Sequence, residues 1–309
     1  MTTISAKTIL RSRNASAPNK VLSTLLLRYP RFIHAEFMTH RCMSRNAASS
    51  RAIPVKKMID DILADTAMPI HWGAAQKGMQ ADQECDEFLY FLDTGVMRST
   101  GVFKSNRTLA WKIARDNAIE VARAFEAAGY HKQVINRLLE PFMHITVLVS
   151  STEWDNFLEL RDHKDAEPHI QMLAREIRKC LEDESTVQTL QPGEWHTPFI
   201  TDEDLYFVRT CDTRNFPEIR TLEEALRQLS VARCASTSYK TTDGFDMTLE
   251  RATTIYDKLH SKPFHASPFE HVAQADEYND VRTFEWANQE EHGNFVGFRQ
   301  LRRQLELQA

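Results

Sequence analysis

The stretch T-H-R-C-M-S-R-N-A-A-S-S-R, Thr39 to Arg51, combines two kinds of recognition chemistry. His40 and the arginines at positions 41, 45 and 51 supply cationic or protonatable donors, and small serine, asparagine and alanine side chains surround them. An arginine presents a planar, permanently charged fork that matches phosphate oxygens, and small hydroxyl residues let backbone N–H groups approach the same anion. The stretch therefore predicts an anion-recognition site, and a solvated loop is the alternative interpretation.

The rest of the chain has the composition of a globular protein. Its 309 residues, 42% hydrophobic and 26% charged, are enough for one large domain or two smaller ones. The five cysteines are scattered and form no C-x-x-C pair, which favours a reducing compartment over a disulfide framework or a zinc site. No apolar run approaches the ~20 residues of a membrane span, and residues 1–20 lack a signal-peptide core. We therefore expect a soluble, cytoplasmic protein with no membrane partner.

The formal net charge of −5 is unevenly distributed. Residues 1–60 hold 11 Lys and Arg against only Glu36 and Asp60, a balance of +9, so the remainder carries −14. A basic head could bind nucleic acid, but the acidic body would repel a polyanion. A small phosphorylated ligand fits this distribution better, and no nucleic-acid partner is expected.

Hydrophobic periodicity predicts a mixture of strands and helices. The apolar runs at residues 21–29 and 143–150 predict strands. Residues 32–45 predict a helix that carries His40 and Arg41 near its end. Residues 183–215 are polar and contain Pro192, Gly193 and Pro198, so a connecting loop is expected there. Further helices are expected after Pro54 and over residues 108–128, 134–139, 152–160, 169–181, 222–235 and 248–259.

Residues 265–271, H-A-S-P-F-E-H, place two histidines beside Glu270. A separation of six residues does not put two ligands on one helix face, and no cysteine or second histidine pair completes a set, so no metal site is expected. The chain also lacks G-x-G-x-x-G, Walker and G-x-S-x-G motifs.

Thr39 to Arg51 resembles the signature R-H-R-x-x-S-x-N-x-x-S-x-R of the flavin-dependent thymidylate synthases, the ThyX-type enzymes, with Thr39 in place of the first arginine. Residues 134–170 resemble a second region of that family, with Arg137 before a strand and N-F-L-E-L-R at Asn156 to Arg161. Residues 265–271 resemble its H-x-T/S-P-F-E-H element, and residues 233–239 an accompanying R-x-S-Y/F-type stretch. Together these regions span roughly half of the chain.

The chain departs from the family pattern in two ways. The H-A-S-P-F-E-H element follows the signature instead of preceding it, as in a circular permutation, which is tolerated when the original termini lie close together. Several residues also differ from those that are usual at positions contacting nucleotide or flavin, namely Thr39, Glu36, Ala47, Ser150 and Thr152.

The resemblance implies an α+β subunit in which helices flank a β-sheet, and a homotetramer with active sites shared between subunits. We expect residues 1–182 to form the core that carries the signature, residues 183–221 a connecting segment, and residues 222–309 a C-terminal segment packed on that core. The implied reaction is reductive methylation of dUMP to dTMP, with FAD as cofactor, methylenetetrahydrofolate as carbon donor and NADPH as reductant.

The resemblance also implies a role for individual residues. Arg161 would be catalytic, stabilising negative charge on the pyrimidine, with a helix C-cap as its alternative role. The residues implied to bind dUMP are Glu36, Ser49, Ser50, Arg51, Arg137 and Arg161. The residues implied to bind FAD are Thr39, His40, Arg41, Ser150, Thr152, Asn156, His265 and Ser267. Cys42 is expected to pack rather than act as a nucleophile, and a surface salt bridge is the alternative for Arg137.

Two other functions remain open from the sequence. The nearer is a flavin-dependent dUMP hydroxymethylase on the same scaffold, producing 5-hydroxymethyl-dUMP, for which a virus acting in its host cytoplasm is a plausible source. The more distant is a nucleic-acid-binding module that uses the basic head, and steep salt dependence of DNA binding would identify it.

Overall fold

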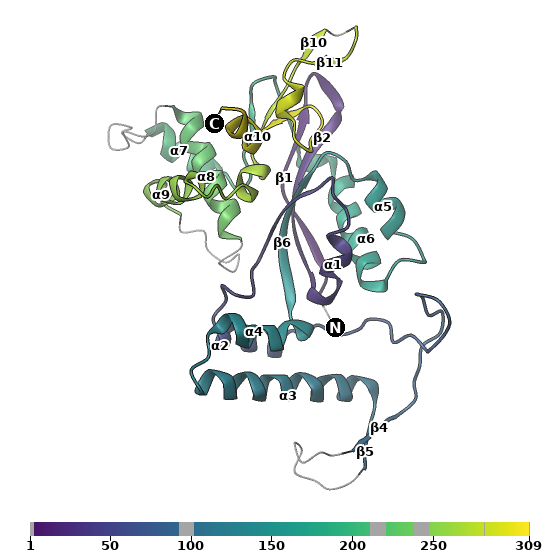
Figure 1. The fold of residues 1–309 in the computed structure, drawn as a ribbon. Helices are drawn as coiled ribbons and strands as arrows, with labels where there is room; N and C mark the ends of the chain where they lie inside the picture. Colours follow the sequence, from purple (N-terminus) through teal and green to yellow (C-terminus); the bar gives the residue numbers. More distant parts are fainter. Residues whose placement is uncertain (1–2, 93–101, 211–220, 238–246, 281, 309) are drawn as a thin grey trace.

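The computed structural model describes residues 3–92, 102–210, 221–237, 247–280 and 282–308. At its centre lies a five-stranded sheet with the strand order β3-β6-β2-β1-β7 (Figure 1). β1 and β2 form a long antiparallel hairpin, β6 pairs antiparallel with both β2 and β3, and β7 runs parallel to β1. The strands are β1 Ser5–Asn14, β2 Ala17–Pro30, β3 Ser44–Ala47, β6 His144–Ser151 and β7 Val187–Leu190.

The two faces of this sheet differ in chemistry. One face is apolar and packs against α5 (Asp155–Arg161) and α6 (Pro168–Glu182), with η1 (Arg31–Ile33) and α1 (His34–Phe37) beside them. The other face carries a polar row, because Thr24, Ser150 and Ser44 lie opposite one another in neighbouring strands. Side chains in a strand alternate between faces, so the same strands supply the apolar residues of one face and the polar row of the other.

Three helices form a second core at the foot of the sheet (Figure 1). They are α2 (Val55–Ala64), α3 (Arg107–Ala127) and α4 (Lys132–Leu139). Asn106 caps α3 by accepting a hydrogen bond from the backbone N–H of Leu109, and Gly129 with φ of 84° follows its end. A hairpin of β4 (Leu89–Leu92) and β5 (Val102–Ser105) precedes α3.

The C-terminal part covers the polar face of the sheet. Here α8 packs against α7 and α9, and a small sheet of order β12-β9-β8 lies beside it. The elements are β8 Trp195–His196, α7 Asp202–Thr210, α8 Leu222–Ser236, α9 Leu249–His260, η5 Ser267–His271, β9 Ala273–Ala275, β10 Tyr278–Asp280, β11 Glu285–Trp286, β12 Phe298–Gln300 and α10 Leu301–Gln308. Short 3₁₀ turns also occur at η2 Glu140–Phe142, η3 Glu184–Thr186 and η6 Gln289–Glu291.

Most of the predicted elements are confirmed, including both strands and the mixed α+β class. The helix predicted over residues 32–45 is wrong, because only η1 and α1 are helical and Ser44–Ala47 instead pairs with β6. Tertiary pairing here prevails over local propensity. The predicted loop over residues 183–215 is also wrong, since β7 pairs with β1, β8 pairs with β9 and α7 is helical. The three-part division of the chain stays a prediction.

Some sequence predictions concern residues that the structure does not describe. The last residues of the R-x-S-Y/F-type stretch, Ser238 and Tyr239, lie among the residues that are not described. Within the described ranges, no helix is both long and apolar enough to cross a membrane.

Candidate functional site

Arg161 at the C-terminal end of α5 contacts three residues that lie at or just before the start of the signature. Its Nε donates to Nε2 of His40 at 2.9 Å, and its Nη2 donates to Oγ1 of Thr39 at 3.3 Å. Its Nη1 lies 3.9 Å from the Glu36 carboxylate. The segment N-F-L-E-L-R and the signature therefore form one cluster, as the sequence predicted for residues of a common site.

The bond from Arg161 determines the state of His40. A guanidinium has only donors, so Nε2 of His40 must carry a lone pair and the ring proton sits on Nδ1. Burial and the nearby charges of Arg161 and Arg45 lower the pKa of His40, which favours this neutral form. Phe157 packs edge-on against the ring at 4.9 Å, so His40 is held as a fixed acceptor for Arg161.

Glu36, whose carboxylate is partly buried, is the third contact of Arg161. Burial and the neighbouring Glu167 raise the pKa of Glu36, while Arg161 opposes them. Because the contact with Arg161 is long, the guanidinium is secured mainly through its Nε edge. The arrangement presents a positioned cation whose outer N–H groups can meet an acceptor on a ligand.

A second cluster contains Ser50 and Arg137, two of the residues predicted to bind dUMP. Ser50 and Arg137 both donate to Oε1 of Glu140, at 2.6 and 2.9 Å. Arg31 lies 3.3 Å from the other carboxylate oxygen. Arg51 is exposed and, within the described residues, makes no hydrogen bond or ion pair.

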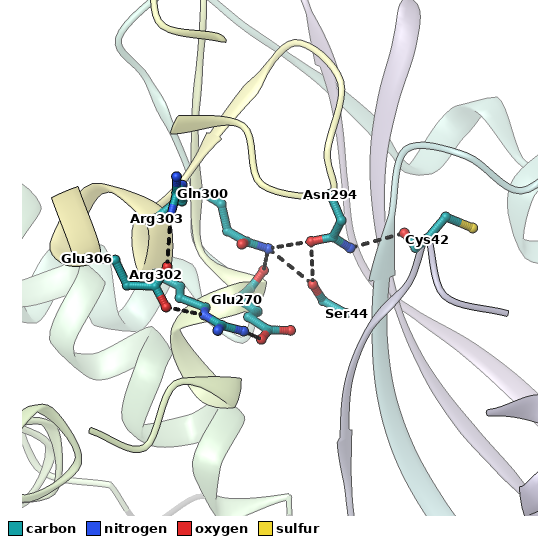
Figure 2. A network of polar contacts seen from close by, with 8 residues as sticks. All are labelled: Cys42, Ser44, Glu270, Asn294, Gln300, Arg302, Arg303 and Glu306. Carbon is teal, nitrogen blue, oxygen red and sulfur yellow. Dashed lines mark hydrogen bonds and ion pairs between the residues drawn. The ribbon is translucent and has the colours of Figure 1, made fainter. Parts of the chain in front are cut away.

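The H-A-S-P-F-E-H element reaches the signature through a network of amides (Figure 2). Gln300 Nε2 lies within hydrogen-bond distance of Ser44 Oγ, the Glu270 carbonyl and Asn294 Oδ1, at 3.1, 3.1 and 2.9 Å. Asn294 in turn donates to the carbonyl of Cys42 at 3.0 Å. As a result, η5 lies against β3 in the same chain.

Beside this network opens a polar cleft of about 650 Å³. Arg302 pairs with Glu270 and Glu306 on one wall (Figure 2). Arg41 also lines the cleft and is exposed, while Arg45 is anchored to the carbonyl of His40 at 2.9 Å. The cleft is lined by Arg41, Met43, Arg45, Glu270, Gln289, Glu290, Gly293, Asn294, Gln300, Arg302, Arg303 and Glu306.

Two of the residues predicted to contact flavin are committed to internal bonds. Ser150 is fully buried, and its hydroxyl bonds to Thr24 Oγ1 at 2.6 Å and to His271 Nδ1 at 2.9 Å. Oγ1 of Thr152 accepts from the backbone N–H of Val296 at 3.0 Å. A flavin cannot reach Ser150 in this structure, because no part of its side chain is accessible.

Apart from His40, which is buried, the remaining predicted flavin residues keep polar groups near the surface. Arg41, Asn156 and His265 are exposed, and Ser267 is half-buried. Thr39 is also exposed, although its hydroxyl already bonds to Arg161 and to the carbonyl of Glu36. Polar groups at these positions are therefore accessible to a ligand at the surface of the subunit.

Buried polar groups form a chain across the second face of the sheet. His271 bonds to Ser150, Ser150 to Thr24, and Thr24 to His196 at 2.8 Å. His196 then bonds to Ser12 Oγ at 2.7 Å. Burial lowers the pKa of His196 and of His271 to about 3, so both rings are neutral at physiological pH.

Sequence reasoning missed several members of these clusters. Glu140 had one usable signal, because it follows Arg137 at the i, i+3 spacing of helical ion pairs. Arg31 and Gln300 had no such signal, since their partners come from distant segments. The polar S-T within the apolar run at residues 21–29 was the only indication of the buried chain.

Comparisons with known proteins give a weak likeness. A scan against protein-family models finds no match, and a search of curated proteins finds none either. Among solved structures, the chain is similar to the UMP/dUMP methylase PolB from Streptomyces cacaoi bound with 5-Br UMP, with a TM-score of 0.40, 15% identity, and coverage of 60% of this chain and 91% of that chain. The same protein bound with 5-Br dUMP gives a TM-score of 0.39, 14% identity, and coverage of 60% and 92%. A likeness at this level leaves the function to be argued from the residues and their geometry.

Proposed function

We propose that the chain is a flavin-dependent thymidylate synthase that methylates dUMP at C5 to give dTMP. The supporting observation is that the three segments carrying the family resemblance meet around β3. Arg161 of the second segment bonds to His40 of the signature. His271 of the third bonds to Ser150, which lies opposite Ser44 of β3 in the sheet. Segments so far apart in sequence would not converge on one strand by local propensity alone.

The cluster around Arg161 supplies the chemistry that C5 of uracil needs. Negative charge must be stabilised on the pyrimidine while the new bond to carbon forms, and a fixed guanidinium does this at any working pH. Cys42 is not placed as a nucleophile, because its Sγ lies 3.5 Å from the carbonyl of Glu153 and its side chain packs against the main core. Arg161 therefore has the charge-stabilising role in the proposal.

Ser50, Arg137 and Arg51 would hold the nucleotide. Ser50 and Arg137 offer a hydroxyl and a guanidinium to the 5′-phosphate, and the exposed Arg51 adds a third donor. Ser49 and Glu36 would contact the sugar and base. In the proposed homotetramer, neighbouring subunits share these contacts.

FAD is the proposed cofactor, and when bound it supplies hydride chemistry that replaces a protein nucleophile. Arg41, Asn156, His265 and Ser267 would hold it, since their polar groups remain accessible. NADPH and methylenetetrahydrofolate are the proposed co-substrates.

Two measurements on the purified protein test this proposal. A visible absorption spectrum before and after added FAD reports cofactor binding, and mass spectrometry reports the product formed from dUMP, methylenetetrahydrofolate and NADPH. A gain of CH₂ identifies dTMP, whereas a gain of CH₂O identifies the hydroxymethylated nucleotide. A folded protein that neither binds FAD nor converts dUMP would exclude both enzymes.

A further inference from the structure

The carboxylate of Glu140 is the meeting point of three donors from separate elements. Oε1 accepts from Ser50, in the loop after β3, and from Arg137 on α4, at 2.6 and 2.9 Å. Oε2 faces Arg31, at the start of η1, at 3.3 Å. Two guanidinium groups and a hydroxyl therefore surround one anionic group.

This donor set is the kind that recognises a phosphomonoester. Guanidinium forks and small hydroxyls donate to phosphate oxygens as they do to a carboxylate, and all three groups converge from different directions. Arg51 lies next to Ser50 in the chain and is exposed, so it adds a cation to the same loop. The single negative charge of Glu140 does not neutralise these arginines, so this region keeps an excess of positive charge.

The backbone that carries Ser50 and Arg31 is held in place by contacts that do not involve Glu140. Asn136 is fully buried, and its Nδ2 donates to the carbonyls of Ser50 and Ile53 at 2.7 and 2.9 Å. Lys132 donates to the carbonyl of Ala52 at 2.8 Å. The backbone N–H of Arg31 donates to the carbonyl of Met143 at 3.0 Å. The loop would therefore keep its shape if the carboxylate left.

Glu140 is itself ionised and accessible. Burial alone would raise its pKa, but the hydrogen bond from Ser50 and the charges of Arg31 and Arg137 hold that pKa below its usual value. Its side chain is 21% exposed, so a ligand can approach from solvent. A carboxylate and a phosphate repel each other, and they cannot use the same donors at once.

We propose that Ser50, Arg31 and Arg137 form a subsite for the 5′-phosphate of the nucleotide, and that the Glu140 carboxylate fills this subsite until the phosphate displaces it. The identity of the nucleotide rests on the proposed function, but the phosphomonoester class does not. Arg31 becomes a phosphate ligand that lies outside the signature. Because the phosphate must displace Glu140, a nucleotide with further contacts through sugar and base binds better than free phosphate.

Calorimetric titration of the full chain with dUMP, inorganic phosphate and deoxyuridine tests this proposal. Glu140→Gln should bind dUMP and phosphate roughly tenfold more tightly or better, because charged hydrogen bonds no longer have to be broken. Binding of deoxyuridine, which has no phosphate, should not change. Adding Arg31→Gln to Glu140→Gln should weaken phosphate binding again. The matched control is Glu291→Gln, which removes a carboxylate that is 17% exposed and lies 2.6 Å from Arg299.

The outcomes separate this inference from the proposed function. Unchanged or weaker binding of dUMP and phosphate by Glu140→Gln would overturn the inference, because Glu140 would then serve to hold the donors in place. If that variant does not fold, Glu140→Asp keeps the charge but reaches the donors less well, and it should tighten phosphate binding by a smaller factor. Tighter phosphate binding without any dUMP binding would support the subsite and reject dUMP as substrate. If the protein turns over dUMP but Glu140→Gln changes neither dUMP binding nor phosphate binding, the subsite is rejected and the proposed function is kept.

Discussion

Arg161 and His40 are 121 residues apart in sequence, and a hydrogen bond of 2.9 Å joins them. The guanidinium can only donate, so Nε2 of His40 must be unprotonated, and this contact fixes the tautomer of the ring. His40 thus acts on Arg161 as a positioning residue. The same histidine was predicted from sequence to contact flavin, and in the proposed site its Nδ1–H remains for that purpose.

Arg161→Lys should lose most of the turnover of dUMP. Lysine keeps the positive charge, but it cannot bond to His40 in the plane of a fork and still present donors to the pyrimidine. Removal of one positioned donor at a developing oxyanion costs ~3 kcal/mol or ~10²-fold in rate, and a loss of that order is expected. The measurement is kcat for Arg161→Lys and Arg161→Ala, with dUMP affinity and FAD content as controls that should change less. Near-normal turnover in both folded variants would leave Arg161 as a helix cap.

Substitutions of His40 should distinguish its role in positioning Arg161 from its role in packing against Phe157. His40→Gln supplies a carbonyl oxygen that can accept from Arg161, whereas His40→Phe keeps the contact with Phe157 but leaves no acceptor. Loss of this one hydrogen bond to a charged group costs ~2 kcal/mol, so we expect kcat to fall more than tenfold in the phenylalanine variant and less in the glutamine variant. KM for dUMP should change little in either. Equal activity of the two variants would rule out the positioning role.

The sequence predicted those elements whose own residues determine them. The strand at residues 21–29 and the helix ending at Gly129 have strong apolar patterns, and both occur in the structure. β3 was missed because S-R-N-A has no apolar alternation, and its register comes entirely from β6. β1 was missed because inward positions hold Arg11, Ser12 and Asn14, whose partners lie up to 283 residues away.

Contacts in the candidate site, like β1 and β3, depend on residues that are distant in sequence. The motifs predicted Arg161, Arg137 and Ser50 as candidate site residues, because residue types at fixed spacing carry that information. The contacts between these residues and their neighbours were not predictable, because Glu140 and Arg31 meet Ser50 only after three elements have packed. Ser150 was placed near flavin by analogy, yet pairing with Thr24 turns its hydroxyl into the interior.

Gly293→Ala should destabilise the network at the cleft. Gly293 has φ of 63°, and a Cβ there would lie 2.6 Å from Oε1 of Gln300. The matched control is Gly129→Ala, where φ is 84° but a Cβ would meet nothing within 4 Å. Both variants should lose about 1 kcal/mol from left-handed backbone strain, and Gly293→Ala should lose about 1–3 kcal/mol more as Gln300 gives up hydrogen bonds. Equal losses in urea unfolding would mean that Gln300 moves aside without giving up its hydrogen bonds.

The free energy of unfolding should fall as the pH drops from about 6.5 to 5. His196 and His271 are fully buried with pKa values lowered to about 3, mainly by burial, whereas an unfolded histidine titrates near 6.5. Below pH 6.5 the unfolded chain therefore binds more protons than the folded one, so stability declines toward acid and is flat above about pH 7. Each histidine contributes up to ~1.4 kcal/mol per pH unit. Urea unfolding at several pH values measures the slope, which His271→Gln should reduce and His163→Gln, at an exposed histidine, should leave unchanged. A slope for His271→Gln equal to that of the unmodified chain would mean that His271 takes up its proton in the folded state, against its placement in the buried chain.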